Sequence, residues 1–358
     1  MGSVRKLNIG FYSPYFPMLG GGERYLLTIA SLFSATQSTS LVIDPSVLKR
    51  IFTTFGLQVE NTIIIHPYEF LSLNTLNRFR YLRKFDAFFY TTDGSVFFSS
   101  SKKNYLVIQS PAHIPVATIF NRIKLSNWES LCYSSFMRDI IQKRLSRNSL
   151  IIPPAIDNIF FDQKRAKKRN IILTVGRFFP HPHNKRQEVL IEVFKSFAKR
   201  ALSGWKLVVV GGLTEEGGNK VVGQLKKLSE GSAVEIKVNV GFKELLELYR
   251  ESKVYWHAAG FGEDLETNPE RAEHFGITTL EAMASGCVPI IFPAGGQVEL
   301  VQDGENGYYW KTPQELIEKT ALLSQDDKLT QSVARRAKES ARLYSLDNLK
   351  TSYEKLLE

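Results

Sequence analysis

The chain is poor in cysteine and has no long apolar run. Its 358 residues include only two cysteines, Cys132 and Cys287, which are too few for a disulfide scaffold and which we interpret as buried thiols. No run of about 18 apolar residues is present that could span a bilayer. The short apolar run at 7–12 is typical of a first strand, not of a signal peptide. These absences predict a cytoplasmic protein.

The fingerprints of several function classes are also missing. Neither half has a glycine fingerprint with an acidic residue about 20 positions later, as a nicotinamide-dependent oxidoreductase would need. No base-reading or stacking motif accompanies the positive charge, so we expect no nucleic-acid partner. His181 and His183 share a proline-rich loop, and we do not expect them to bind a metal.

Positive charge is in excess, and it is concentrated in the first half. The net charge is +10, and residues 1–165 contain 19 Lys and Arg against 10 Asp and Glu. Segment 138–147 interleaves bases with isoleucine and leucine, as on an amphipathic helix. Two interpretations are open: a solvated helix face, or contact with an anionic membrane surface or lipid diphosphate. The second would place the protein at the inner face of the membrane.

Short apolar runs alternate with helical patterns through both halves of the chain. They lie at 7–12, 41–43, 63–65, 87–90 and 106–108, and a second series begins at 171–175. Such runs predict parallel sheets covered by helices on both faces. We predict an N-terminal domain over 1–165, a polar hinge at 164–170 and a C-terminal domain over 166–343. Two doubly wound domains facing a central cleft would hold a ligand at the carboxyl ends of both sheets.

Two glutamates, Glu273 and Glu281, stand on either side of a tight Phe-Gly-Ile turn at 275–277. The turn opens a helix, whose backbone N–H groups and positive dipole end can face an anion. Each carboxylate is an acceptor for hydroxyl groups, so the stretch describes a nucleotide-sugar site. Two solvated carboxylates at a helix end would be the plainer interpretation. A second glycine turn at 295–296 favours the nucleotide-sugar site.

Two basic residues follow the first strand of the second domain. Arg177 comes directly after Val175 and Gly176, and Lys185 precedes the next helix. An arginine fork and a lysine point charge can converge on one diphosphate, where they would neutralise the leaving nucleotide as a metal does elsewhere. The alternative is ordinary surface charge.

Taken in order, these motifs resemble the donor-site signature of the family 4 retaining glycosyltransferases, which have the GT-B type fold. The resemblance is carried by 273–286 and by the Gly-Gly-Gln-Val-Glu turn at 295–299, and segment 255–276 resembles one bacterial subgroup. It covers nearly the whole chain and is densest from Ile171 to Trp310. It implies two Rossmann-like domains and a last helix, within 344–358, that returns to the first domain.

The resemblance also implies roles for residues. Arg177 and Lys185 would bind the donor phosphates, Glu273 would orient the sugar and Glu281 would hold the ribose. A first-domain glycine turn would approach the phosphates, and a second-domain loop would hold the nucleobase by main-chain contacts. The implied donor-binding residues are Gly20, Gly21, Gly22, Gly176, Arg177, Lys185, Val240, Gly241, Phe242, Glu273, Phe275, Gly276, Ile277 and Glu281.

Four residues are candidates for catalysis: Glu273, Arg177, Lys185 and His113. Many related enzymes carry a histidine where this chain has Gln109, and His113 could substitute for it at the sugar or the acceptor. Which of the two contacts the reacting sugar stays open. We expect His257 and His274, which flank the donor loop, to order it.

The implied activity is transfer of a sugar from a nucleotide-diphosphate sugar to a glycan or polyprenyl-linked acceptor. The resemblance implies retention of the anomeric configuration, with no metal and no cofactor besides the donor substrate. Two other proteins of the same fold class are alternatives: a sugar-nucleotide epimerase and a non-catalytic nucleotide-sugar-binding protein.

Overall fold

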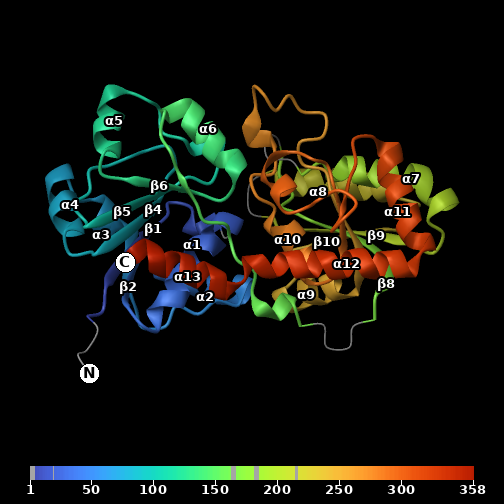
Figure 1. Cartoon of the computed structure of the whole chain (residues 1–358), viewed down its shortest axis with the longest axis horizontal. Coiled ribbons are helices and arrows are strands. Elements are labelled where there is room, and N and C mark those ends of the chain that lie inside the picture. The colour runs from blue at the N-terminus through green and yellow to red at the C-terminus, as the bar shows by residue number, and fades with distance from the viewer. Residues whose placement is uncertain (1–4, 19, 163–166, 181–184, 214–216) are drawn as a thin grey trace. The chain divides into compact units, whose positions relative to one another are not determined.

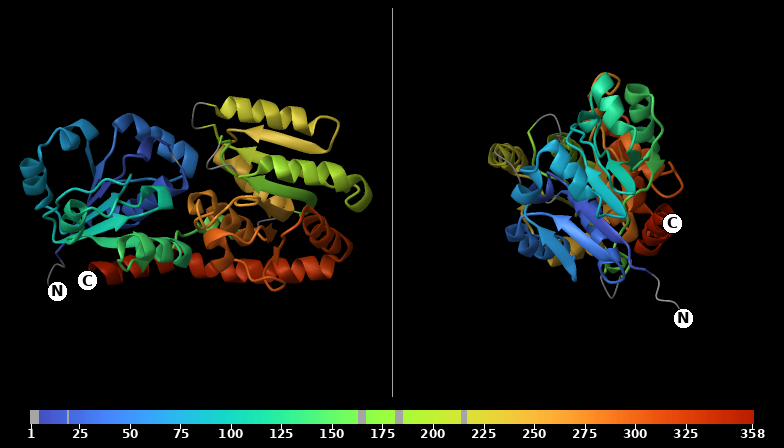
Figure 2. Two further views of the ribbon diagram at one scale, coloured as in Figure 1. Left: turned by 90° about the horizontal axis from the view of Figure 1, so that it is seen from above. Right: turned by 90° about the vertical axis from the view of Figure 1, so that its left-hand side faces the viewer.

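The computed structural model describes residues 5–18, 20–162, 167–180, 185–213 and 217–358 (Figure 1). The chain forms two compact units, Met1–Pro154 with Leu349–Glu358, and Ala155–Asn348. Each unit has its own parallel sheet with helices on both faces (Figure 2). The predicted fold class, two Rossmann-like doubly wound domains, is confirmed.

The sheet of the first unit has seven parallel strands in the order β3-β2-β1-β4-β5-β6-β7. Their bounds are β1 Asn8–Tyr12, β2 Ser38–Val42, β3 Thr62–Ile65, β4 Ala87–Thr91, β5 Lys103–Val107, β6 Glu129–Cys132 and β7 Leu150–Ile151. The central strands are apolar and buried on both faces, which fixes them inside the unit. The strand order reverses between β1 and β4, so a ligand site is expected at the carboxyl ends of these two strands.

The helices of the first unit bury apolar stripes on this sheet. They are α1 Gly21–Ser34, α2 Pro45–Phe55, α3 Pro67–Leu71, α4 Thr75–Leu82, α5 Ile119–Leu125 and α6 Ser135–Leu145, with short 3-10 turns at Phe16–Met18 and Pro111–His113. On α6, within the segment predicted to be amphipathic, Ile141 and Leu145 are buried in the core. The apolar side of that helix therefore packs inward, and only its basic side faces solvent.

The last helix, α13 Leu346–Leu357, brings the end of the chain into the first unit. The Tyr353 hydroxyl is hydrogen-bonded to the hydroxyl of Tyr25 on α1, and both side chains are buried. At the end of the helix, the Leu356 carbonyl accepts hydrogen bonds from Tyr105 Oη at 2.8 Å and Lys103 Nζ at 3.1 Å. The prediction of a last helix that returns to the first domain is confirmed.

The sheet of the second unit has six parallel strands in the order β10-β9-β8-β11-β12-β13. Their bounds are β8 Arg169–Val175, β9 Lys206–Gly211, β10 Val234–Val238, β11 Ser252–His257, β12 Val288–Ile291 and β13 Tyr308–Tyr309. The order reverses between β8 and β11, which makes their carboxyl ends the switch point of this sheet.

The second unit contains α7 Gln187–Ala201, α8 Gly218–Ser229, α9 Phe242–Glu251, α10 Ile277–Ala284, α11 Pro313–Gln325 and α12 Asp327–Ala341. Its 3-10 turns are Asn158–Phe160, Pro269–Arg271, Gly295–Glu299 and Arg342–Tyr344. The buried ammonium of Lys168 donates to the carbonyls of Ser252 at 2.7 Å and Ser285 at 2.8 Å, directly after α9 and α10. This contact fixes the C-terminal end of α10, and the candidate site lies at the other end of the helix.

The unit boundaries differ from those predicted from sequence. The division lies after Pro154, not after residue 165, and again after Asn348, not after 343. The reason is packing: the Phe160 ring contacts the rings of Phe242 and Tyr249, so this segment belongs to the core of the second unit. Part of the predicted hinge, 163–166, lies outside the described residues.

Candidate active site

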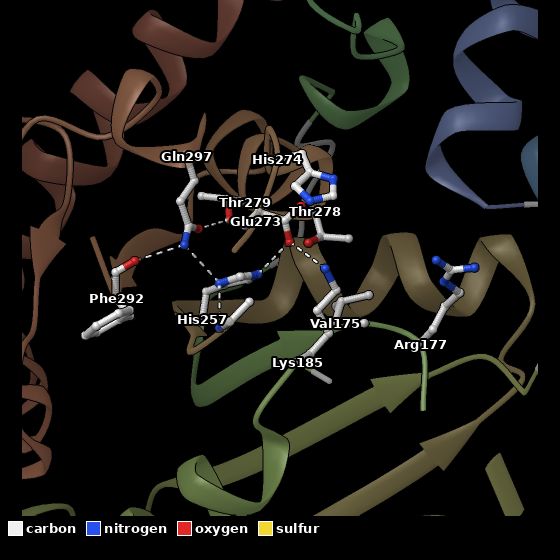
Figure 3. A network of polar contacts seen from close by, with 12 residues as sticks. Val175, Arg177, Lys185, His257, Glu273, His274, Thr278, Thr279, Phe292 and Gln297 are labelled. Atoms are coloured by element: carbon white, nitrogen blue, oxygen red, sulfur yellow. Dashed lines mark hydrogen bonds and ion pairs between the residues drawn. The ribbon is translucent and has the colours of Figure 1, made fainter. Parts of the chain in front are cut away.

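A polar network occupies the carboxyl edge of the second sheet, at its switch point (Figure 3). β11 ends at His257, and Lys185 lies between β8 and α7. Glu273 comes from the loop before α10, and Gln297 lies in the turn after β12. Four separate segments thus supply one cluster, because the strands that precede them are parallel and end at the same edge.

An ion pair is the centre of the network. Lys185 Nζ lies 2.8 Å from Glu273 Oε2, and His257 Nε2 lies 3.0 Å from the same oxygen. Burial alone would raise the pKa of the Glu273 carboxyl, but the charge of Lys185 and the hydrogen bond from His257 outweigh it. The pKa is therefore held well below its usual range, and the carboxylate is ionised at neutral pH.

The hydrogen bonds of His257 define which ring nitrogen carries the proton. The side-chain amide nitrogen of Gln297 lies 3.1 Å from His257 Nδ1, and the Ala259 N–H lies 3.4 Å from it. Both are donors, so Nδ1 must accept. The proton then resides on Nε2 and is donated to Glu273, as in histidines whose second partner fixes the tautomer.

The orientation of the Gln297 amide is fixed in turn. Its nitrogen also donates to the Phe292 carbonyl at 3.0 Å, and its oxygen faces the Thr279 hydroxyl at 3.4 Å. Because a carbonyl can only accept, the amide nitrogen must point toward Phe292 and His257. Gln297 is fully buried, so the chain Gln297–His257–Glu273 is a rigid support for the carboxylate.

The second glycine turn holds the backbone of Glu273. The Gly296 N–H donates to the Glu273 carbonyl at 2.7 Å. At Gly295, φ is +71° and an added Cβ would lie 2.0 Å from the same carbonyl oxygen, so only glycine fits there. In the structure this turn therefore positions the loop that carries Glu273.

The predicted helix start at Phe275-Gly276-Ile277 is confirmed. Gly276 is the N-cap of α10 with φ +103°, and no side chain caps the helix. The first turn contains no acidic residue, so its N–H groups keep the partial positive charge that attracts anions. Beside it, the Thr278 hydroxyl accepts a hydrogen bond of 2.8 Å from Tyr255.

Glu281 lies one helical turn further along α10 and is buried. Tyr249 Oη donates to Glu281 Oε2 at 2.9 Å. Burial and then the neighbouring carboxylate hold the pKa of Tyr249 well above its usual range, so the phenol stays a donor. Sequence reasoning missed Tyr249 and Gln297 as site residues, because each lies far along the chain from the glutamate that it supports.

The remaining second-unit candidates lie at the same sheet edge. An added Cβ at Gly176 would lie 2.8 Å from Lys185 Cγ, so this glycine makes room for the lysine stem. The Arg177 guanidinium stacks on the Phe179 ring at 4.9 Å, and Figure 3 shows it apart from the Lys185–Glu273 pair. The structure therefore brings Lys185 and Glu273 together, and Arg177 is not part of that pair.

The loop predicted to bind the nucleobase leads into α9, with Gly241 as the N-cap and Phe242 as the first helical residue. Val240 precedes them and is half-buried. The Phe242 ring is directed at Phe160. The predicted contact between the main chain of this loop and a nucleobase stays a prediction. His274 Nε2 lies 3.2 Å from the Glu270 carbonyl, so this histidine helps to order the loop before α10.

The first-unit candidates lie at the switch point of their own sheet. Gly20 is the N-cap of α1, which starts at Gly21, and the Gly20 N–H donates to Glu23 at 2.8 Å. An added Cβ at Gly22 would lie 1.6 Å from Gln109 Oε1, so Gln109 packs directly on the glycine turn. The amide nitrogen of Gln109 has no hydrogen-bond partner among the described residues.

His113 stacks on Tyr15 with ring centroids 4.9 Å apart, and its Nε2 is hydrogen-bonded to the Tyr15 hydroxyl at 3.1 Å. Burial lowers the pKa of His113, although the charge of Asp93 opposes the shift. Nδ1 is buried and has no partner within the described part of the chain. Both His113 and Gln109 thus keep a polar group available for a ligand, and the choice between them stays open.

The described residues contain neither a metal-binding cluster nor a membrane-spanning helix. In those residues, no group of three or more His, Cys, Asp or Glu side chains could hold a metal ion. His181 and His183 lie outside the described residues. None of the described helices combines the length and the apolar character needed to cross a membrane.

A family model described as glycosyl transferases group 1 matches residues 155–340, which is more than half of the chain. The chain belongs to this family. The matched span contains the whole polar network, from Gly176 to Gln297.

Curated relatives are similar over part of their length. The chain is 25% identical over 236 residues to a GDP-Man:Man(3)GlcNAc(2)-PP-Dol alpha-1,2-mannosyltransferase of Dictyostelium discoideum, covering 62% of this chain and 44% of the relative. The Xenopus laevis protein of that name is 30% identical over 159 residues, with 42% and 30% covered. A trehalose synthase of Pyrococcus horikoshii is 26% identical over 228 residues, with 59% and 52% covered. The chain thus spans about half of these relatives or less.

Solved structures share the fold over the whole chain. HepE of Anabaena, solved in complex with UDP and glucose, superimposes with a TM-score of 0.70 at 15% identity and 99% coverage of both chains. A glycosyltransferase of Rickettsia africae gives a TM-score of 0.74 at 15% identity, covering 99% of this chain and 98% of the other. At this identity the likeness establishes the GT-B fold.

Proposed function

We propose that the protein is a retaining glycosyltransferase of family 4. It would move a sugar from a nucleotide-diphosphate sugar to a glycan or lipid-linked saccharide. One observation carries the proposal: the ionised Glu273, paired with Lys185 and supported by His257, lies beside the uncapped N-terminus of α10. A fixed carboxylate next to a cation and a helix dipole suits a ligand that contains both sugar hydroxyls and phosphates.

In this proposal the donor is held by the second unit. The phosphates bind Arg177, Lys185 and the first-turn N–H groups of α10. Glu281, whose carboxylate is held by Tyr249, accepts the ribose hydroxyls. The main chain at Val240 and Gly241 contacts the nucleobase, and no metal is required because two cationic side chains and a helix dipole neutralise the diphosphate.

The reaction proceeds on one face of the sugar. The bond between the anomeric carbon and the phosphate oxygen breaks as the acceptor oxygen forms its bond on the same face. The departing phosphate oxygen takes the proton of the acceptor hydroxyl. Glu273 stabilises the positive charge that develops on the sugar ring, and Lys185 and Arg177 stabilise the negative charge on the leaving group. In the first unit, the residue that contacts the transferred sugar or the acceptor is either His113 or Gln109.

The acceptor is proposed by analogy with the relatives. The mannosyltransferases that the chain resembles act, by name, on a saccharide linked to a lipid diphosphate. A comparable acceptor would bring this protein into peripheral contact with an anionic membrane through its basic first unit. The names of the relatives and neighbours include both GDP-mannose and UDP, so both nucleotides are candidates for the donor.

A thermal-shift panel tests the proposal. UDP, GDP, ADP and their sugar conjugates are added to the wild type and to Glu281→Ala, each with and without EDTA. A ligand at about 100 times its Kd stabilises the fold by about 2.7 kcal/mol. We expect one nucleotide series to raise Tm, EDTA to leave the shift unchanged and the variant to lose it. No shift with any nucleotide would refute the donor site.

The alternatives give different outcomes in a turnover assay with the stabilising nucleotide sugar. An epimerase would convert it to a second nucleotide sugar without an acceptor, and a binding protein would leave it intact. A retaining transferase would release the nucleotide and give a product whose anomeric configuration, read by NMR, matches that of the donor.

A further inference from the structure

Four of the exposed apolar side chains of the first unit lie on α5 and in the loop before it. Ile119 is 81% exposed, Val116 72%, Phe120 59% and Ile123 55%. On a helix of seven residues, Ile119 and Ile123 are four positions apart and therefore share one face. Isolated exposed apolar residues are ordinary, but a contiguous group of four marks an interaction site.

The local structure presents this group rigidly. The Thr118 side chain caps α5 by accepting from the Asn121 N–H at 3.1 Å, and the Asn121 amide donates to the Val116 carbonyl at 2.9 Å. The Phe120 ring packs edge-on against Phe98 at 5.9 Å. The apolar side chains are thus held outward by the fold and are not the end of a frayed loop.

Bases surround the apolar group. Arg122 lies within α5, and Lys124 Nζ stands 4.6 Å above the Phe120 ring. From residue 103 to 154 the chain has seven Lys and Arg against two Asp and Glu. A third base lies at the end of α5: Arg147, two residues after α6, donates to the Leu125 carbonyl at 2.7 Å, and Figure 1 shows α6 beside α5.

We infer that α5, with Val116, is a docking surface for a lipid bilayer containing anionic headgroups. Apolar side chains beside lysine and arginine suit such a surface. The apolar side chains can enter the acyl boundary, and the basic side chains can remain among the anionic headgroups. Contact with an anionic surface was one of two interpretations of segment 138–147, but Ile141 and Leu145 of α6 are in the core and Ile140 packs against it. In this proposal the side chains that insert into the bilayer are those of α5, and α6 contributes only positive charge that attracts the headgroups.

A second copy of the chain fits the surface less well. A stable protein interface buries about 800 Å² on each partner, far more than one face of a seven-residue helix offers. Two copies joined through this face would also bring like charges together, whereas an anionic bilayer complements them. The lipid contact is independent of the proposed sugar transfer, because it rests on exposure and charge alone.

Co-sedimentation with phosphatidylcholine vesicles, with and without phosphatidylglycerol, tests the inference. We expect the wild type to bind the anionic vesicles. It should be released at 1 M salt, where the Debye length is only about 3 Å. The triple variant Ile119→Ser/Phe120→Ser/Ile123→Ser should lose at least about tenfold in partitioning. Arg122→Gln/Lys124→Gln should lose about fivefold per charge.

Matched controls lie elsewhere on the surface. Ile63→Ser/Leu343→Ser removes two exposed apolar side chains, and Arg335→Gln/Lys350→Gln removes two exposed bases. Both control variants should bind vesicles as the wild type does, and all variants should keep a Tm close to that of the wild type because none of the changed side chains is in the core.

Three results would overturn the inference. The wild type could fail to bind anionic vesicles, or the controls could lose as much binding as the α5 variants. Alternatively, size-exclusion chromatography with light scattering could show a dimer that the triple serine variant converts to a monomer, which would identify a second copy as the occupant.

Discussion

The support of Glu273 by a buried amide can be tested by the substitution Gln297→Leu. Leucine has nearly the volume of glutamine but donates no hydrogen bond. The change removes the donor to His257 Nδ1 at 3.1 Å and to the Phe292 carbonyl at 3.0 Å. The proton on His257 is then free to move from Nε2 to Nδ1, where it no longer reaches Glu273.

The magnitude follows from the contacts. A buried acceptor that loses its donor costs about 1–3 kcal/mol. The Phe292 carbonyl loses its Gln297 donor, whereas Nδ1 keeps the weak Ala259 donor at 3.4 Å. Burial of the leucine methyl groups offsets part of the loss, so we expect destabilisation of about 2 kcal/mol. Weakening of the charge-assisted bond to Glu273, worth about 1.5–3 kcal/mol, should lower kcat about tenfold or more.

Two measurements are needed. Steady-state kinetics with the nucleotide sugar that stabilises the wild type should show a lower kcat and a KM changed by less than about twofold, because phosphate and ribose contacts are untouched. A two-bond proton–nitrogen NMR spectrum reads the tautomer of His257, assigned by its absence in His257→Phe. The wild type should show the proton on Nε2, and Gln297→Leu a mixture. Gln297→Glu, which offers an acceptor to Nδ1, should show both nitrogens protonated.

A control separates support from simple loss of stability. Thr330→Val removes a buried hydrogen bond of 2.7 Å to the Leu323 carbonyl, remote from the site, and should cost about 1–2 kcal/mol without lowering kcat. The proposed support of Glu273 by Gln297 is refuted if Gln297→Leu keeps the wild-type tautomer and turnover. It is equally refuted if Thr330→Val, at the same loss of Tm, lowers kcat as much.

Three further predictions concern the donor site. Glu281→Ala should mainly raise the Kd for the nucleotide, measured by calorimetry, whereas Glu273→Ala should mainly lower kcat. An unchanged Kd in the first variant and an unchanged kcat in the second would contradict the roles proposed for the two glutamates. Gly176→Ala should weaken nucleotide binding at least about tenfold by displacing Lys185, whose Cγ would lie 2.8 Å from the new Cβ. Lys185→Met should destabilise the protein at neutral pH. Since the depressed pKa of Glu273 stabilises the fold fully above the unfolded value of about 4.3, the difference from the wild type should shrink as pH falls below that value, in urea titrations.

Much of the fold could be predicted because its strands are locally recognisable. Runs such as 87–90 and 171–175 are continuous apolar segments, and they form β4 and β8 as expected. β6 at Glu129–Cys132 was not predicted, since its four residues include a glutamate and a serine. β13 was not predicted either, because Tyr308–Tyr309 is only two residues long and is defined by pairing with β12.

The candidate site was predictable as a set of motifs but not as a network. The helix start at Gly276 follows from local glycine chemistry, and the structure has it at that residue. The partners of the glutamates do not follow from local rules: His257 lies 16 positions from Glu273, and Tyr249 lies 32 positions from Glu281. Their meeting depends on which strands are neighbours in the sheet, and no periodicity in the sequence encodes strand order.

The network bears on how Glu273 can act. A nucleophile or a general base must give up an electron pair, and its reactivity falls as its pKa falls. Oε2 of Glu273 already faces both Lys185 and His257, and the pKa of the carboxyl is held well below its usual range. Such a carboxylate is a weak nucleophile and a weak base, but it keeps its negative charge throughout the reaction. The geometry therefore favours an electrostatic and orienting role over a covalent glycosyl intermediate, and it agrees with a course in which the departing phosphate takes the proton.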